Sequence, residues 1–307
     1  AAEQIGFSEN GVWNFPNGAV LIKHFDYPVD DDDPSVTKKI ETRFSIKGDD
    51  GNFYFLTYNW REDQSDADLQ EVGLEEPIQI ATTGGGTRTV DWYFPSNSEC
   101  TTCHNSASGG SLGPRTRYLN KEYDYSSKPG GTLGNQLVTL SHLGILDEVI
   151  TDTDTPNYLT HTSIDDPTGT VDDKARSYMD LNCAYCHQPG TGNRADFDLR
   201  LSNTLAQTGL LTAGINSPLG IAPDEEIVFA GDATKSILYH RTNSTDPTIM
   251  MPPLAKNEID VQGVALLETW INQLQPQAPA PNLGDYRIVN RGSGKTLQVP
   301  SAAFGNG

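Results

Sequence analysis

All four cysteines of the chain fall in two short motifs of the same pattern. Residues 100–104 read CTTCH and residues 183–187 read CAYCH. The pattern C-x-x-C-H is typical of covalent haem attachment, in which two thiols form thioethers with the porphyrin and the next histidine ligates the iron. We therefore predict two covalently bound haem c groups. The expected thioether residues are Cys100, Cys103, Cys183 and Cys186, and the expected proximal iron ligands are His104 and His187.

Three other uses of paired cysteines were weighed against haem attachment. A single Cys₄ zinc site would leave the histidine after each pair without a role, and it would join pairs that lie far apart in the sequence. A thioredoxin-like redox pair would need different surroundings from those of either motif. Two disulfides are a further alternative in an exported protein. Two complete motifs that use every cysteine favour haem.

The second motif is flanked by elements that can position a haem. A helix is predicted over 171–181, with Thr170 as its cap, and the motif follows at its end. Downstream, Met251 stands before two prolines, which would stiffen the loop and hold a thioether over the iron. Met251 is therefore the expected distal ligand, and Met250 is the alternative. Apolar residues at helical spacing predict another helix over 264–274.

The residues before the first motif have the pattern of β-structure. Apolar and polar residues alternate over 40–46, which is the period of a strand, and an aromatic stretch follows over 52–60. Glycines at 84–86 separate two further apolar stretches, 78–80 and 90–94, and predict a hairpin. The first motif therefore follows directly on a predicted strand.

The distal ligand of the first haem is not obvious, because every methionine of the chain lies in the region of the second motif. His142 lies on a predicted helix over 134–146 among leucines, where packing can aim a side chain, and it is the first candidate. His24 and Lys23, on a predicted strand, are the alternatives. An open or water-bound iron is a further one.

Short segments along the chain resemble a bacterial family of exported diheme c-type cytochromes. The resemblance extends over residues 10–276 and implies electron transfer, without pointing to a particular partner. The segments that carry it are FPNG at 15–18, KHF at 23–25, IETR at 40–43, TYNW at 57–60, LGPR at 112–115, LN at 119–120, NQL at 135–137, NCAYCH at 182–187 and MP at 251–252.

The order of elements around the second motif resembles a class I cytochrome c domain. In such a domain a helix, the C-x-x-C-H motif, loops, a methionine loop and a terminal helix follow one another, and the last helix crosses the first. The resemblance implies that His187 and Met251 are the axial ligands of the second iron. It also implies that Tyr178 and Trp270 make the aromatic contacts at the crossing.

The end of the chain has a different character. Residues 277–283 are rich in proline and alanine, which is typical of a linker. Residues 284–307 resemble the opening repeat of an R-type (ricin B-like) β-trefoil lectin, and this resemblance implies polysaccharide binding. The segment is much shorter than a trefoil, so we expect only the first strands of a truncated one. An ordinary strand pair is the alternative.

These inferences predict an α+β fold class with a division into five parts. The parts are a β-rich domain at 1–95, a first haem-binding region at 96–165, an all-α class I cytochrome c domain at 166–276, a linker at 277–283 and a short β segment at 284–307.

The composition narrows the choice of partners and compartment. The chain has 41 acidic and 21 basic residues and a formal net charge of −20, so we expect no nucleic-acid partner, because phosphate binding needs lysine and arginine. No apolar run is long enough to span a bilayer, and we expect no transmembrane segment. The chain does not open with a basic region and an apolar stretch. We therefore expect a mature periplasmic or extracellular protein whose signal peptide has been removed.

The predicted function is electron transfer to or from a redox partner protein. The lectin resemblance suggests that the carrier is tethered to carbohydrate and serves an oxidoreductase that acts on polysaccharide. One alternative is a diheme peroxidase-like enzyme with an open first haem. Another is self-assembly into an extracellular filament of stacked haems. The motifs favour an electron-transfer protein over an enzyme.

Overall fold

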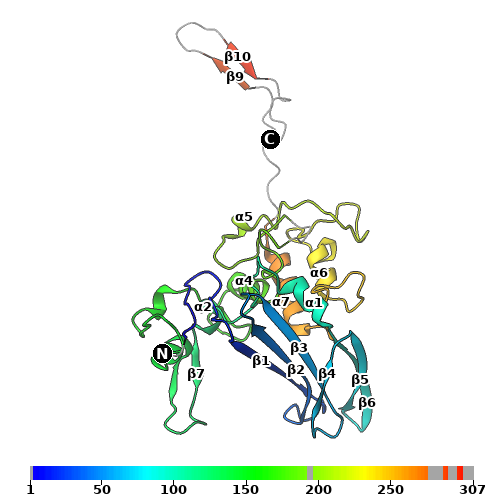
Figure 1. Cartoon of the computed structure of the whole chain (residues 1–307). Coiled ribbons are helices and arrows are strands. Elements are labelled where there is room, and N and C mark those ends of the chain that lie inside the picture. The colour runs from blue at the N-terminus through cyan, green and yellow to red at the C-terminus, as the bar shows by residue number, and fades with distance from the viewer. Residues whose placement is uncertain (1–2, 192–195, 276–285, 290–295, 300–307) are drawn as a thin grey trace.

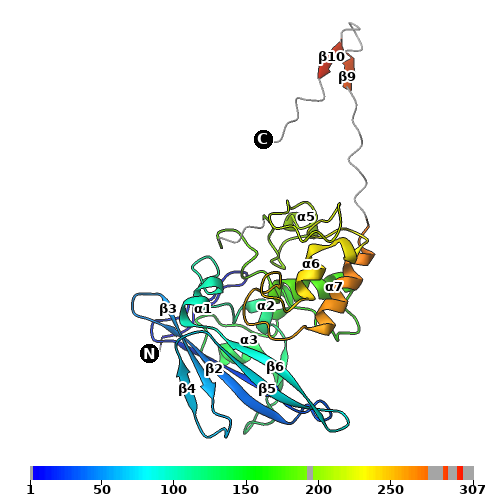
Figure 2. The ribbon, with the colours of Figure 1, turned by 90° about the vertical axis from the view of Figure 1, so that its right-hand side faces the viewer.

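The computed structural model describes residues 3–191, 196–275, 286–289 and 296–299. Strands gather at one end of the main body in both views (Figures 1 and 2). At the other end lie the helices α4 (Val171–Asn182), α6 (Ile237–Thr242) and α7 (Val261–Gln273). In the chain order, the first C-x-x-C-H motif follows the last long strand of the β-rich end, and the second lies within the helical end, directly after α4.

The β-rich end is built on a four-stranded antiparallel sheet in the order β1-β2-β3-β4. Its long strands confirm the prediction from alternating residues, because each pairs over most of its length with the next strand along the chain. The strands are β1 (Val20–Pro28), β2 (Thr37–Lys47), β3 (Phe53–Trp60) and β4 (Ala67–Gln70).

A separate hairpin covers one face of this sheet. It consists of β5 (Leu74–Thr82) and β6 (Gly86–Phe94), which pair antiparallel along their whole length, as predicted. Gly84 and Gly85 form the turn with positive φ angles of 89° and 86°, a conformation that favours glycine. The ring of Trp92 on β6 lies 5.8 Å from the ring of Phe25 on β1, edge to face. This packing holds β6 in place, and the helix that carries the first motif begins three residues after β6 ends.

The chain between the two motifs forms small elements around a core of its own. Trp13 and Phe15 from the N-terminal segment pack there against Leu137, which is fully buried. The predicted helix over 134–146 is present but shorter. The elements are α1 (Asn97–Cys103), α2 (Thr116–Leu119), β7 (Glu122–Asp124), β8 (Leu133–Asn135), α3 (Gln136–His142) and the 3-10 turn η1 (Thr155–Asn157).

The helical end contains the two helices that the sequence predicts around the second motif. They pack on a core that includes Met179, Leu267 and Ile271. A Cβ atom at Gly263 of α7 would overlap the ring of Tyr178 on α4, so glycine permits this close crossing. Nε1 of Trp270 donates a hydrogen bond of 2.8 Å to Oδ1 of Asp172 across the same pair of helices. The elements are α4 (Val171–Asn182), α5 (Leu205–Thr208), η2 (Ala233–Lys235), α6 (Ile237–Thr242) and α7 (Val261–Gln273).

The predicted fold class is wrong in its central part, an all-α class I cytochrome c domain over 166–276. The protein is β-rich, with 23% strand and 22% helix, and its described residues form antiparallel sheets and seven α-helices without such a domain. The sequence between α4 and α7 is rich in Gly, Pro, Asn, Asp and Thr, which favour turns. The described residues of this segment therefore form turns and loops with short helices between them, α5 and α6 among them.

The C-terminal segment falls mostly outside the described residues. Two strands, β9 (Tyr286–Val289) and β10 (Thr296–Val299), pair antiparallel. The predicted linker at 277–283 lies outside the residues that the structure describes, as do most residues of the predicted lectin segment at 284–307. Among the described helices, none combines the length and the apolar character that crossing a membrane requires.

Candidate haem-attachment site

The first motif begins on α1, whose start is held by one carboxylate. Glu99 accepts a hydrogen bond of 2.8 Å from the backbone N–H of Ser96 and one of 2.7 Å from its hydroxyl. The hydroxyl of Tyr93, on β6, donates a bond of 2.7 Å to the same carboxylate. The hydrogen bond to Glu99, with a smaller contribution from burial, raises the pKa of Tyr93 to about 12, so the phenol stays a donor. The helix that carries Cys100 is therefore tied to the end of β6.

The His104 imidazole is prepared to act as a ligand. Its Nδ1 lies 2.8 Å from the carbonyl oxygen of Gly110, and its ring lies 4.6 Å from that of Phe55 on β3. A bond from Nδ1–H to a carbonyl leaves Nε2 as the nitrogen with a free lone pair, which is the usual arrangement in metal-ligating histidines. Burial lowers the pKa of His104, and the positive charges of Arg43 and Lys23 lower it further. The ring is therefore neutral at pH 7.

The second motif begins where α4 ends. Thr170 caps α4 by accepting a hydrogen bond of 3.1 Å from the backbone N–H of Asp173, as the sequence predicts for this cap. Cys183 forms the end of the helix, and its backbone N–H donates to the carbonyl of Met179 at 2.9 Å. The motif then continues in a tight turn.

The two motifs share one local geometry. In each, the histidine N–H donates to the carbonyl of the first cysteine, at 2.9 Å from His104 to Cys100 and at 2.8 Å from His187 to Cys183. The chain therefore makes the same helical turn twice, with the histidine one turn beyond the first cysteine. This is the arrangement that C-x-x-C-H attachment needs, because both thiols and the imidazole must approach one porphyrin.

His187 lies in a more enclosed place than His104. Its ring stacks on Phe197 with a centroid distance of 4.5 Å and an angle of 12°. Burial lowers its pKa to about 4. Its Nδ1 is buried and has no hydrogen-bond partner among the residues that the structure describes. The ring is therefore neutral at pH 7, but within the described residues its Nδ1 lacks the carbonyl partner that orients His104.

The second cysteines of the two motifs are in contact. The Sγ atom of Cys186 lies 3.6 Å from that of Cys103 and donates a hydrogen bond to it. This bond lowers the pKa of Cys103 and raises that of Cys186. All four motif cysteines are half-buried. Within the described residues, no three His, Cys, Asp or Glu side chains converge as ligands of a bare metal ion.

A buried ionic cluster fixes the relative position of the two motif regions. Both carboxylate oxygens of Asp180, on α4, bind the guanidinium of Arg117, at 2.6 and 3.0 Å. His161 lies 2.6 Å from the same carboxylate, and the backbone N–H of Leu201 donates to it at 3.0 Å. Burial alone would raise the pKa of Asp180, but the bonds from His161 and Arg117 outweigh it and lower the pKa. Asp180 is therefore a carboxylate at neutral pH.

A small cavity lies beside this cluster, between the two motif regions. Its volume is about 130 Å³, and three arginines line it, Arg115, Arg117 and Arg200. Residues adjoining both motifs complete it, among them Ala107 after the first and Tyr185 within the second. Two of these arginines are paired with carboxylates, Arg117 with Asp180 and Arg200 with Asp198, whereas Arg115 donates to the carbonyl of Ser108 at 2.9 Å.

The methionine loop lies on the side of the second motif. The ammonium group of Lys256 donates to the carbonyls of Thr242, Met251 and Arg241, at 3.2 Å for Met251 and 3.4 Å for Arg241. Burial raises the pKa of Cys183 to about 12, and the charge of Lys256 acts against this rise. Lys256 therefore connects the loop that carries Met251 with the surroundings of Cys183.

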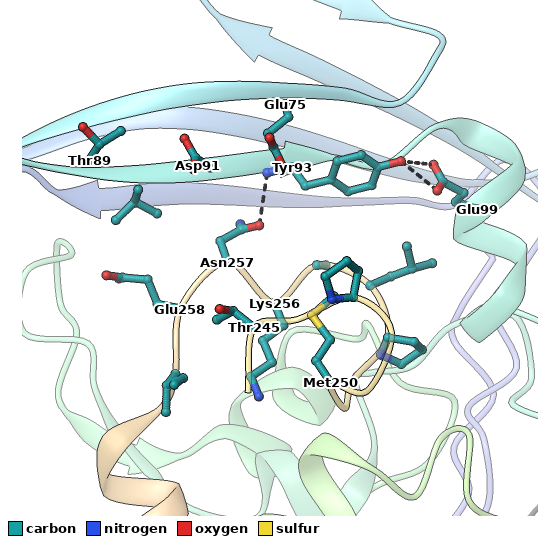
Figure 3. A pocket seen from close by; sticks show the side chains of 16 residues that line it. Glu75, Thr89, Asp91, Tyr93, Glu99, Thr245, Met250, Lys256, Asn257 and Glu258 are labelled. Atoms are coloured by element: carbon teal, nitrogen blue, oxygen red, sulfur yellow. Dashed lines mark hydrogen bonds between the residues drawn. The ribbon is translucent and has the colours of Figure 1, made fainter. Parts of the chain in front are cut away.

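The two methionines of this loop have different surroundings. Met250 lines a cavity of about 870 Å³ between the loop and the β5–β6 hairpin, whereas Met251 does not (Figure 3). Asn257 closes one side of this cavity by accepting a hydrogen bond of 3.1 Å from the backbone N–H of Tyr93. The predicted ligand Met251 is half-buried, and its N–H donates to the carbonyl of Arg241 at 2.9 Å. Both methionines remain candidates for the second iron.

The three candidates for the first distal ligand lie in different places. Lys23 pairs with Arg43 across β1 and β2, on the sheet face that carries Phe55 and contacts His104. His24, one residue on, points to the opposite face, where its Nδ1 lies 2.8 Å from the hydroxyl of Thr42. His142 is exposed in the last turn of α3. The structure thus brings Lys23, but not His24, to the side of the first motif.

Sequence reasoning missed the residues that hold the two motifs together. Asp180 is the clearest case, because an acid near the C-terminal end of a helix opposes the helix dipole. Such a conflict between local preference and position indicates a specific partner. Arg117 gave no comparable signal, since its partner is distant in the sequence.

Comparison with known proteins adds no relative. No family model, no curated protein and no solved structure matches the chain.

Proposed function

We propose that the protein is an exported electron-transfer protein that carries two covalently attached haems. The observation that carries the proposal is the convergence of two C-x-x-C-H motifs of the same local geometry, with Cys103 and Cys186 in contact at 3.6 Å. A Cys₄ zinc site would also bring the two pairs together, but it would leave the histidine one turn beyond each first cysteine without a role.

The residues of the site fit the proposed groups. Cys100 and Cys103 would hold one haem, and Cys183 and Cys186 the other. His104 and His187 would be the proximal ligands, because both are neutral through burial. A haem is attached through the edge of its porphyrin, which suits half-buried cysteines. Its iron is bound at the centre of the ring, which suits the more enclosed imidazoles.

Haem iron, when bound, supplies reversible one-electron chemistry, which the protein itself does not provide. The side chains have three tasks: they attach the group, orient the imidazoles and exclude water. Gly110 orients His104 through its carbonyl, and Phe197 orients His187 by stacking. Asp180 and Arg117 hold one motif region against the other. A protein that keeps two such sites in contact is suited to pass electrons from one to the other.

The charge of the chain bears on the partner that we propose. A net charge of −20 favours encounter with a redox protein that has a basic surface, and such steering weakens as salt is added. A tether to polysaccharide through residues 284–307, and service to an oxidoreductase acting on it, are part of the proposal and rest on the sequence resemblance. Export to the periplasm or beyond is likewise proposed, since covalent haem motifs favour it.

Intact mass tests the attachment directly. The protein, produced in a host that attaches haem c, should exceed its polypeptide mass by two haem masses after denaturation. Replacing Cys100 and Cys103 by alanine should remove one of these masses, and replacing Cys183 and Cys186 should remove the other. The matched control is Ser98→Ala, an exposed position on the same helix as the first motif, which should keep both. A chain of bare polypeptide mass in the attaching host would overturn the proposal.

A further inference from the structure

The contact between Cys103 and Cys186 has a chemical consequence for the chain before haem is attached. The two residues are 83 positions apart in the sequence, and their Sγ atoms lie 3.6 Å from each other. A disulfide needs about 2.05 Å between the sulfurs. We expect rotation of the two side chains to close this difference.

Pairing within the first motif is less favourable on geometric grounds. Cys100 and Cys103 both lie on α1, three residues apart. Cβ atoms at this spacing on a helix are about 5–6 Å apart, whereas a disulfide prefers about 3.5–4.5 Å. Closing that bond would have to bring the two Cβ atoms closer than the usual helical spacing.

The surrounding structure keeps the two thiols together and accessible. Arg117 and Asp180 join the chain after the first motif to the helix before the second. Ala107 and Gly190, which follow the two motifs, also lie close, since a Cβ atom at Gly190 would lie 3.5 Å from that of Ala107. Both cysteines are half-buried and not enclosed, so a small oxidant can reach them.

We propose that the haem-free chain closes a disulfide between Cys103 and Cys186, across the two motifs. The oxidant is a disulfide of the glutathione class or a disulfide-donating oxidoreductase, as found in the compartments where exported proteins fold. One cysteine sulfur attacks the oxidant, whose S–S bond breaks, and a mixed disulfide forms. The second cysteine sulfur then displaces the reduced oxidant. Two electrons and two protons leave the chain, and one S–S bond is formed.

This disulfide would block both motifs at once, because it takes one cysteine from each. Reduction of a single bond would then open both haem sites together. It is a property of the haem-free chain and does not depend on the proposed electron-transfer function. A chain that never accepts haem can still form it, and a chain that accepts haem readily can fail to form it.

Peptide mapping of the oxidised, haem-free chain tests the proposal. The full chain is produced without haem attachment, reduced, and then exposed to oxidised and reduced glutathione. We expect two of the four thiols to disappear and the peptides of Cys103 and Cys186 to be joined in the unreduced digest. Bonds within the motifs, or four remaining thiols, would overturn the proposal.

Matched variants make the assignment specific. Cys103→Ser and Cys186→Ser should each abolish the cross-link, whereas Cys100→Ser and Cys183→Ser should each keep it. In the double variant of Cys100→Ser and Cys183→Ser only the proposed pair remains, and oxidation should lower the intact mass by the two hydrogen atoms lost. Closing a loop of this length should also raise its urea midpoint relative to the reduced form. An unchanged mass in a variant that unfolds cooperatively would count against the cross-link.

Discussion

Asp180 binds both nitrogens of one edge of the Arg117 guanidinium, at 2.6 and 3.0 Å, although the two residues are 63 positions apart. Asp180 is fully buried and Arg117 is 7% exposed. The first lies three residues before Cys183 on the chain, and the second lies beyond the first motif, so the pair links the two motif regions. Its strength can be measured directly.

We expect Asp180→Asn to lower the free energy of unfolding by about 3–5 kcal/mol, because the Arg117 charge stays buried without its carboxylate. Urea unfolding of the haem-free chain measures the change. The control is Glu62→Gln, which removes an ion pair between Lys38 and an 88% exposed glutamate. That loss should stay below about 1 kcal/mol. Equal urea midpoints for the two variants would show that the Asp180–Arg117 pair contributes no more to stability than an exposed ion pair.

The same residue should give the protein part of its acid sensitivity. The pKa of Asp180 is lowered in the folded chain, whereas an unfolded aspartate has a pKa of about 3.9. As the pH falls, Asp180 is therefore protonated in the unfolded chain at a higher pH than in the folded chain. The stabilisation is therefore complete above about pH 5 and is lost as the pH falls through the lower, folded pKa. The unfolding free energy of the parent, measured between neutral and acid pH, should fall more steeply than that of Asp180→Asn. Parallel curves would contradict the assignment.

The crossing of α4 and α7 should tolerate no side chain at Gly263. A Cβ atom there would overlap the ring of Tyr178, so we expect Gly263→Ala to cost about 1–3 kcal/mol of stability. The control is Gly214→Ala, at a position where a Cβ atom meets nothing within 4 Å. Adding Tyr178→Ala to Gly263→Ala should recover part of the loss, so that the two changes are not additive in thermal or urea unfolding. If the two stability changes were fully additive, the side chain at 263 would not be in conflict with Tyr178.

The two methionines can be separated in the haem-loaded protein. We expect Met251→Ala to lower the reduction potential of one of the two haems, because a thioether ligand raises the potential. Met250→Ala should leave both potentials near their parent values. Potentiometric titration followed in the visible spectrum reads both. If the higher-potential wave shifts only in Met250→Ala, the cavity-lining methionine of Figure 3 is the ligand.

The first iron should be six-coordinate with a second nitrogen ligand. The sequence favours His142, but its side chain is exposed on α3, whereas the charge of Lys23 reaches His104. We therefore expect Lys23→Ala to change the low-spin ferric spectrum of the loaded protein and His142→Ala to leave it unchanged. His24→Ala serves as the matched control, since it alters the adjacent residue on the opposite face of β1. A spectrum altered only in His142→Ala would restore the histidine as the ligand.

The sequence predicted those elements whose pattern is local. The period of two along β2 and the glycines between β5 and β6 were enough for the strands, and apolar spacing was enough for α4 and α7. The loops between the second motif and α7 could not be predicted, because turn-forming residues leave the path of the chain to tertiary contacts. The order of motif, methionine and helix therefore suggested a domain that the described residues do not form.

The candidate site divides in the same way. Its cysteines and histidines were predicted because the motifs are contiguous in sequence. The contact of Cys103 with Cys186 and the bond of Asp180 with Arg117 could not be, since each joins segments far apart in the chain. Nothing in the sequence around Phe197 indicates that its ring stacks on His187.

The loop before α7 takes its shape from one ammonium group. Lys256 reaches the carbonyls of Arg241, Thr242 and Met251, and its three N–H bonds can rotate to meet acceptors in different directions. A guanidinium is planar and fixed, so arginine is not an equivalent replacement there. Acetylation would remove the charge and all but one of the donors. Substitution by arginine or acetylation would therefore weaken the contacts that hold the carbonyls of Arg241, Thr242 and Met251 together.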